Sequence, residues 1–91
     1  MIFVWMGFLK STTEPVPQAV QQQTNDFLSQ PYIKINSVGP LRDPAGNRAG
    51  MMMIFEVDDW ATAENFVKNS PYLEAGLYEE HHLFEYISEV G

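Results

Sequence analysis

The side chains most suited to chemistry lie together in the run Glu79-Glu80-His81-His82 near the C-terminal end. A carboxylate beside an imidazole can tune a general base or contribute to a Zn²⁺ site. In a strand, alternate side chains share a face, which pairs Glu79 with His81 and Glu80 with His82. Two ligands on a face are too few for zinc, so we expect no metal unless a second subunit adds ligands. The simpler interpretation is a solvated start of a strand with one half-buried histidine.

The composition describes a folded, acidic chain of 91 residues, with 45% hydrophobic residues and a net charge of -7. This length predicts a single domain over residues 1–91. An acidic surface repels nucleic acids and anionic membranes, so we expect neither as a partner. The absence of cysteine excludes disulfides and a cysteine nucleophile. The apolar run 1–9 is too short to span a bilayer and lacks the basic start of a signal peptide, which predicts a cytoplasmic protein.

The strands are predicted from runs of apolar and β-branched residues. Residues 1–9 and 50–57 are apolar on both faces, which is typical of buried strands. Residues 32–38 predict a strand with one polar face, and the breaker Gly39-Pro40 follows it. Residues 77–90 contain the last strand, with His81 and His82 on opposite faces.

Two helices are predicted between these strands. The first covers residues 16–29, follows Pro15, and is ended by Pro31. The second begins after Asp58 or Asp59, either of which can accept a hydrogen bond from an early backbone amide.

The element order is strand, helix, strand, strand, helix, strand, which predicts a ferredoxin-like α+β fold. Right-handed crossovers place both helices on one face of a four-stranded antiparallel sheet, and Trp5 and Trp60 are expected to anchor the core. The strands at 1–9 and 50–57 would then leave an apolar patch of several hundred Å² in water. A second copy of the sheet, packed about a two-fold axis, is the simplest cover and would bury about 1,600 Å². We therefore expect a homodimer formed sheet to sheet.

Two short motifs stand out in the second half of the chain. Gly39-Pro40 closes the second strand, and Pro71-Tyr72 is followed by Ala75-Gly76-Leu77-Tyr78-Glu79. With these motifs the chain resembles the YciI-like (YCII-related) family, in which Gly39, Pro40, Pro71 and Gly76 are structural positions. The family is similar in fold to the dimeric α/β-barrel proteins. The resemblance implies proton-transfer chemistry on small aromatic substrates by a helix histidine paired with an aspartate.

Both members of that family pair differ in this chain. The histidine position corresponds to Gln22, or to Gln21 or Gln23 with a small gap, and the aspartate position to Ser70. Glutamine does not titrate, and serine is a poor base without a partner. The acid–base pair that the resemblance implies is therefore missing.

The remaining polar residues suggest a small-molecule site. Gln22, Ser70 and Tyr72 could bind a small aromatic or carboxylate ligand, with His82 nearby and Arg42 as a carboxylate clamp. Alternatively, Ser70 only ends the second helix, Tyr72 is a core ring and Arg42 is a surface charge.

Three functions stay open. The first is an isomerase, lyase or dehydrochlorinase-type enzyme in which His81 replaces the missing base. The second is a non-catalytic ligand-binding or interaction module. The third, suggested by the fold group, is a haem monooxygenase with His81 or His82 as the iron ligand. The chain contains no Gly-rich phosphate loop, nucleophile elbow or dinucleotide fingerprint, so we expect no nucleotide cofactor.

Overall fold

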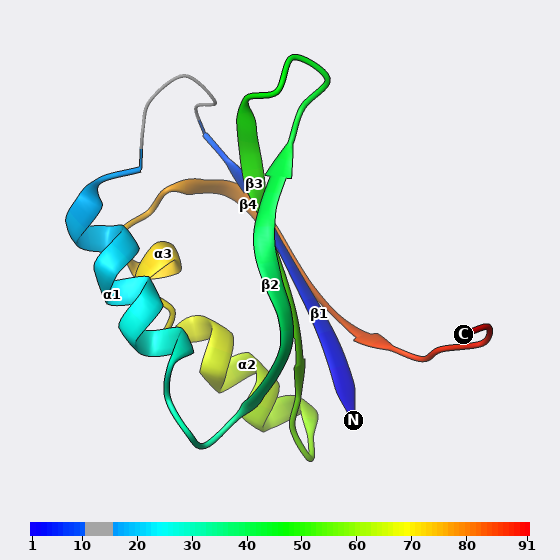
Figure 1. The fold of residues 1–91 in the computed structure, drawn as a ribbon. Coiled ribbons are helices and arrows are strands. Elements are labelled where there is room, and N and C mark those ends of the chain that lie inside the picture. Colours follow the sequence, from blue (N-terminus) through cyan, green and yellow to red (C-terminus); the bar gives the residue numbers. More distant parts are fainter. Residues whose placement is uncertain (11–15) are drawn as a thin grey trace.

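A computed structural model describes residues 1–10 and 16–91 of the chain. One antiparallel sheet, with strands in the order β2-β3-β1-β4, has the helices packed against one of its faces (Figure 1). This arrangement confirms the predicted ferredoxin-like α+β fold. Pro15 lies outside the described residues. The elements are β1 (Ile2–Leu9), α1 (Gln18–Leu28), β2 (Lys34–Arg42), β3 (Arg48–Glu56), α2 (Trp60–Lys68), α3 (Pro71–Glu74) and β4 (Tyr78–Tyr86).

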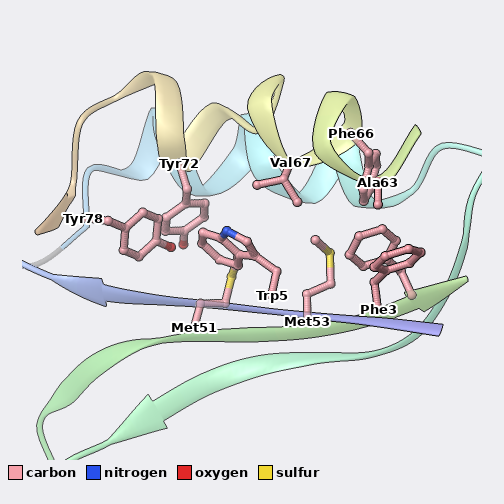
Figure 2. Close-up of a cluster of buried hydrophobic side chains, with 10 residues drawn as sticks. Phe3, Trp5, Met51, Met53, Ala63, Phe66, Val67, Tyr72 and Tyr78 are labelled. Carbon is pink, nitrogen blue, oxygen red and sulfur yellow. The ribbon is translucent and has the colours of Figure 1, made fainter. Parts of the chain in front are cut away.

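The core lies between the sheet and the helices. Phe3 pairs with Phe55, and Trp5 pairs with Met53, in the antiparallel register of β1 and β3. Because paired residues share a face, all four side chains lie on the same face of the sheet and are buried. Figure 2 shows Phe3, Trp5 and Met53 pointing toward the helices. The rest of this buried cluster comes from β3, the helices and β4: Met51, Ala63, Phe66, Val67, Tyr72 and Tyr78.

Trp60 is not the core anchor that the sequence predicted. It is the first residue of α2, and 41% of its surface is exposed. Its indole still contacts the core, because it packs edge-on against Phe3 with ring centroids 4.9 Å apart. Its position at the start of α2 leaves the part of the indole that does not contact Phe3 open to solvent.

Asp59 is the N-cap of α2, which confirms one of the two predicted caps. Its carboxylate accepts a hydrogen bond from the Thr62 backbone amide at 2.7 Å. That bond stabilises the charged form and lowers the pKa of the Asp59 carboxyl.

The prediction that Gly39-Pro40 ends the second strand is wrong. β2 continues through both residues to Arg42, and Pro40 pairs with Met51 of β3. The sheet order explains this, because β2 is an edge strand. Proline has no backbone N–H to donate, and an edge strand tolerates that loss.

The segment before β4 contains a third helix, the short α3, in addition to the two predicted helices. Pro71 occupies its first turn, where a missing N–H costs nothing. Gly76 follows with φ +68°, and its amide donates to the Leu73 carbonyl at 3.1 Å. A residue in the left-handed conformation commonly ends a helix, and glycine adopts this conformation most easily. This explains why position 76 is a glycine.

The face of the sheet opposite the helices is largely apolar. Alternation along the strands places Val4 and Met6 of β1, Ile54 of β3 and Phe84 and Tyr86 of β4 on this open face. Phe84 and Tyr86 are about half exposed. No helix covers this side of the sheet in the described residues (Figure 1). Within the same residues, no helix has the length and apolar character needed to cross a membrane.

Candidate functional site

A cleft of about 200 Å³ opens between α1 and the sheet, and we call it the α1 cleft. α1 contributes a stripe of residues spaced three and four apart, which places them on one helix face. β2, β3 and α3 form the remaining walls. The lining residues are Gln21, Thr24, Asn25, Leu28, Val38, Gly39, Pro40, Arg48, Met51 and Tyr72.

Arg48 is the charged residue of this cleft. Its Nη2 donates a hydrogen bond to the Tyr72 hydroxyl at 3.2 Å, and its guanidinium lies 5.8 Å from the centre of the Tyr72 ring. Arg48 forms no ion pair with any residue that the structure describes. A half-buried cation without a carboxylate partner is suited to binding an anionic ligand.

An irregularity in β3 explains why Arg48 reaches the helix side. Leu41 pairs with Gly50, but the next residue of β2, Arg42, pairs with Arg48, which leaves Ala49 as an extra residue. A bulge of this kind changes the direction in which the neighbouring side chains point. The sequence shows only a charge beside a hairpin turn, and for that reason the prediction did not include Arg48 in the site.

Thr24 adds a second polar group to the α1 cleft. Its side chain is buried, and its hydroxyl has no hydrogen-bond partner among the described residues. A buried hydroxyl without a partner is unfavourable, and a ligand in the cleft could supply the missing bond.

Gln22 lies outside the α1 cleft, although the family resemblance placed it at the site. It is exposed on α1 and faces a different depression, together with Gln18 and Asp26. Gln21, one of the two alternative positions, lines the cleft instead. Both glutamines are exposed, but Gln21 lies between the two depressions and borders the α1 cleft, whereas Gln22, one helix position further, does not.

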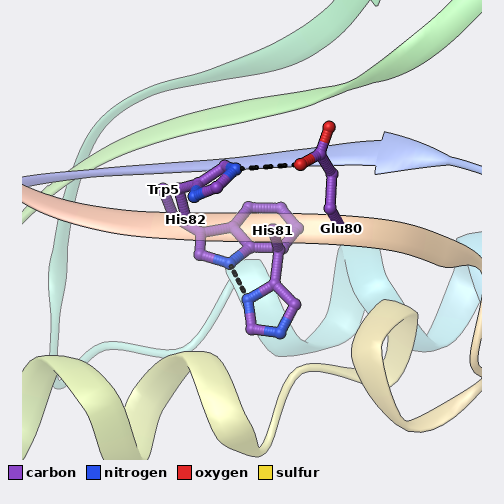
Figure 3. A network of polar contacts seen from close by, with 4 residues as sticks. All are labelled: Trp5, Glu80, His81 and His82. Carbon is purple, nitrogen blue, oxygen red and sulfur yellow. Dashed lines mark hydrogen bonds and ion pairs between the residues drawn. The ribbon is translucent and has the colours of Figure 1, made fainter.

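A second cleft, of about 390 Å³, lies between β4, α2 and α3, and we call it the β4 cleft. It contains His81, whose Nδ1 accepts a hydrogen bond from the Trp5 indole at 3.4 Å (Figure 3). The complete lining is Glu64, Val67, Lys68, Leu73, His81 and Leu83.

His82 points to the other side of the sheet (Figure 3). Its Nε2 lies 3.3 Å from a Glu80 carboxylate oxygen, and its ring stacks on Phe84 with centroids 6.0 Å apart. The pairing of Glu80 with His82 on one face confirms the strand alternation. No group of three or more potential metal ligands occurs among the described residues.

Ser70 and Arg42 are also separate from the clefts. Ser70 is buried before α3, where its backbone amide donates to the Val67 carbonyl. Arg42 lies at the hairpin end of β2, and its Nη1 donates to the Gly46 carbonyl at 3.4 Å. Of the predicted ligand-binding residues, the structure places Tyr72 in the α1 cleft.

A row of aromatic rings connects the two clefts. Tyr72 stacks on Tyr78 with centroids 5.8 Å apart, and Tyr78 packs edge-on against Trp5 at 5.1 Å. The Tyr78 hydroxyl is buried without a partner among the described residues. Burial raises the pKa of Tyr78 strongly, Tyr72 adds to this increase, and the positive charge of Arg48 opposes it.

The fold and the two clefts define an α+β protein whose candidate sites lie between the helices and one face of the sheet. The sequence profile of the YCII-related domain matches residues 1–87, so the chain belongs to the YCII-related family. No curated protein sequence matches the chain.

Among solved structures, the fold is similar to 5-chloro-2-hydroxyhydroquinone dehydrochlorinase (TftG) from Burkholderia phenoliruptrix AC1100, in complex with 2,5-dihydroxybenzoquinone. The TM-score is 0.70 and the sequences are 20% identical, with 96% of this chain and 94% of the other covered. At this identity the similarity describes the fold. The dehydrochlorinase structure therefore agrees with the topology found here.

Proposed function

We propose that the chain binds a small anionic molecule of about one ring in the α1 cleft. The observation that supports this proposal is Arg48, a half-buried guanidinium that has no carboxylate partner among the described residues. Arginine presents several N–H groups in a fixed plane, which suits the oxygen atoms of a carboxylate or an ionised phenol.

The neighbouring hydroxyls suit the same kind of ligand. The Tyr72 oxygen accepts from Arg48, so the hydrogen of the Tyr72 hydroxyl remains available to donate to a ligand. The Thr24 hydroxyl has no partner among the described residues and can also donate. A cavity of about 150 Å³ can hold a benzene ring, and the α1 cleft measures about 200 Å³. Its size and donors therefore favour a single ring that carries acceptor oxygens.

The related fold supports this choice of ligand. The dehydrochlorinase structure contains 2,5-dihydroxybenzoquinone, a single ring with four oxygen atoms. A molecule of this class offers the acceptors that Arg48, Tyr72 and Thr24 could use.

The residues of the α1 cleft favour binding over acid–base catalysis. Gln21 and Asn25, which α1 contributes to the cleft, cannot act as an acid and a base. No carboxylate or imidazole is among the described residues that line the cleft. His81 is also poorly arranged as a base. Its Nδ1 accepts from Trp5, so in the neutral ring the hydrogen is on Nε2, the nitrogen left to face a ligand. We therefore favour a ligand-binding member that lacks the family's proton transfer.

A binding experiment with paired arginine variants tests the proposal. Titration of the native protein with 2,5-dihydroxybenzoquinone and with benzoate, followed by NMR, should show saturable shifts at Arg48, Tyr72 and Thr24. Arg48→Met should weaken binding by about 10-fold or more, because a hydrogen bond to a charged group contributes about 1.5–3 kcal/mol. Arg42→Met, at the other side of the same hairpin, is the control and should bind normally. Equal affinity in the native protein and in Arg48→Met would contradict the proposal.

The second candidate is an enzyme of the dehydrochlorinase type, which the related structure favours. Chloride release from 5-chloro-2-hydroxyhydroquinone distinguishes the two functions. We expect none above the uncatalysed rate. Release that disappears in His81→Gln, but not in His82→Gln, would establish the enzyme instead.

We also propose that the protein is a homodimer formed through the open face of the sheet. Val4, Met6, Ile54, Phe84 and Tyr86 form a continuous apolar surface there. Ile87 and Val90, beyond the end of β4, are exposed as well. An apolar sheet face that no helix covers usually marks an interface with another protein surface.

A further inference from the structure

We propose that the β4 cleft is a second ligand site, which takes a monocarboxylate with an extended apolar body. It differs from the α1 cleft in its walls, its polar groups and its size. The chemistry argued for Arg48 does not involve the β4 cleft, so the ligand proposed for it is argued independently of the one proposed for the α1 cleft.

The walls of the β4 cleft suit an apolar body. Val67 of α2, Leu73 of α3 and Leu83 of β4 contribute aliphatic side chains from three elements. The volume of about 390 Å³ is close to twice that of the α1 cleft. Apolar walls with a few polar groups are the usual composition of a small-molecule site.

His81 provides a hydrogen-bond donor whose orientation is restricted. The indole of Trp5, itself buried in the core, donates to Nδ1 of His81. This contact occupies one ring nitrogen and leaves Nε2–H, in the neutral ring, as a donor. In Figure 3 the His81 ring extends from β4 toward the helices. A carboxylate oxygen or another acceptor can use this donor.

Lys68 provides the charge that favours a carboxylate. It is the last residue of α2 and lines the cleft, and it forms no ion pair with any described residue. Glu64, one turn earlier in α2, also lines the cleft. Its negative charge opposes every acidic group on the ligand, so Lys68 can balance one carboxylate at most and a dicarboxylate is disfavoured.

The β4 cleft would remain accessible in the proposed dimer. It lies on the helix side of the sheet, whereas the open face lies on the other side. Tyr72 faces the α1 cleft and Leu73 the β4 cleft, so α3 separates the two sites.

The two tryptophans allow a direct test by ¹H–¹⁵N NMR of the full chain with 4-phenylbutyrate as the probe. Binding in the β4 cleft should shift the Trp5 indole resonance and the amides of His81, Leu73 and Leu83 in a saturable way. The indole of Trp60, which packs on Phe3 and is not among the residues that line this cleft, is the internal control. 4-Phenylbutanol, which lacks the charge, should bind at least 5-fold more weakly.

Paired variants locate the site. Lys68→Met and His81→Phe should each weaken 4-phenylbutyrate binding by about 5-fold or more, in keeping with the loss of one charge-assisted contact. His82→Phe, on the opposite face of the same strand, should leave the affinity unchanged.

Three results would overturn the proposal. These are the absence of saturable shifts at millimolar probe, shifts centred on the α1 cleft, and an affinity that neither Lys68→Met nor His81→Phe changes. Loss of binding in the α1 cleft alone would contradict the proposed function but leave this inference standing.

Discussion

The hydroxyl of Tyr78 is buried among aromatic rings, and no described residue accepts its hydrogen. A buried polar group without a partner costs about 1–3 kcal/mol of stability. Tyr78→Phe removes this group and keeps the ring that packs against Trp5 and Tyr72. We therefore expect Tyr78→Phe to raise the free energy of unfolding at neutral pH by about 1 kcal/mol, measured by chemical denaturation.

The same substitution should change the response to alkali. Burial raises the pKa of Tyr78 above its ordinary value of 10.0. The neutral hydroxyl is therefore fully compatible with the fold below that pH. As the pH rises further, the unfolded chain releases this proton while the folded chain retains it, and stability falls. Tyr78→Phe should show a smaller loss of stability above about pH 10 than the native protein.

Tyr72→Phe is the control for both measurements. It deletes a hydroxyl that does have a partner, Arg48, and should lower the stability instead. An identical alkaline decline in the native protein and in Tyr78→Phe would show that Tyr78 does not control this response.

At the scale of single residues, the sequence predicted which side chains could take part in chemistry better than it predicted where the fold places them. The opposite faces of His81 and His82 followed from the alternation of a strand. Arg48 was not predicted, because a bulge at Ala49 turns it toward the helices, and a bulge has no clear signature in one sequence. Gln22 was placed from a family correspondence, where an offset of one residue rotates a side chain about 100° around the helix.

At the scale of the elements, Gly50 lets the backbones of β1 and β3 lie close together. A side chain added to Gly50 of β3 would place Cβ against the Gly7 carbonyl oxygen of β1, whereas Gly39 of β2 has open space around it. Gly50→Ala must therefore push β1 and β3 apart and should cost about 2–3 kcal/mol, a typical value for overpacking. Gly39→Ala should change the stability far less. Thermal unfolding of the two variants measures the difference, and equal melting temperatures would contradict this account.

The order of the elements was predictable because each strand and helix carries its own local pattern. Strands apolar on both faces, an aspartate cap at Asp59 and the alternation of β4 each followed from a few neighbouring residues. The extent of β2 was not predictable in this way. A Gly-Pro pair usually interrupts a strand. β2 continues through Gly39-Pro40 because it lies at the edge of the sheet. Edge position is a property of the assembled sheet.

At the scale of the whole molecule, the open face predicts the oligomeric state. Phe84→Glu would place a charge within the proposed interface, where it would have to lose its hydration. We expect the native protein to have the mass of a dimer at micromolar concentration, by light scattering after size exclusion, and Phe84→Glu to have that of a monomer. Tyr32→Glu is the matched control, because Tyr32 is 90% exposed and lies outside the sheet. A native protein with the mass of a monomer would refute the dimer.

The four-residue helix α3 has a further consequence. Tyr72 and Leu73 are consecutive, yet each belongs to the wall of a different cleft. A turn this short has little freedom to move one of these side chains without the other, so a ligand that displaces α3 from one side alters the opposite pocket. Thermodynamic linkage then requires reciprocity: if saturation of the first pocket changes the affinity of the second by some factor, saturation of the second must change the first by the same factor.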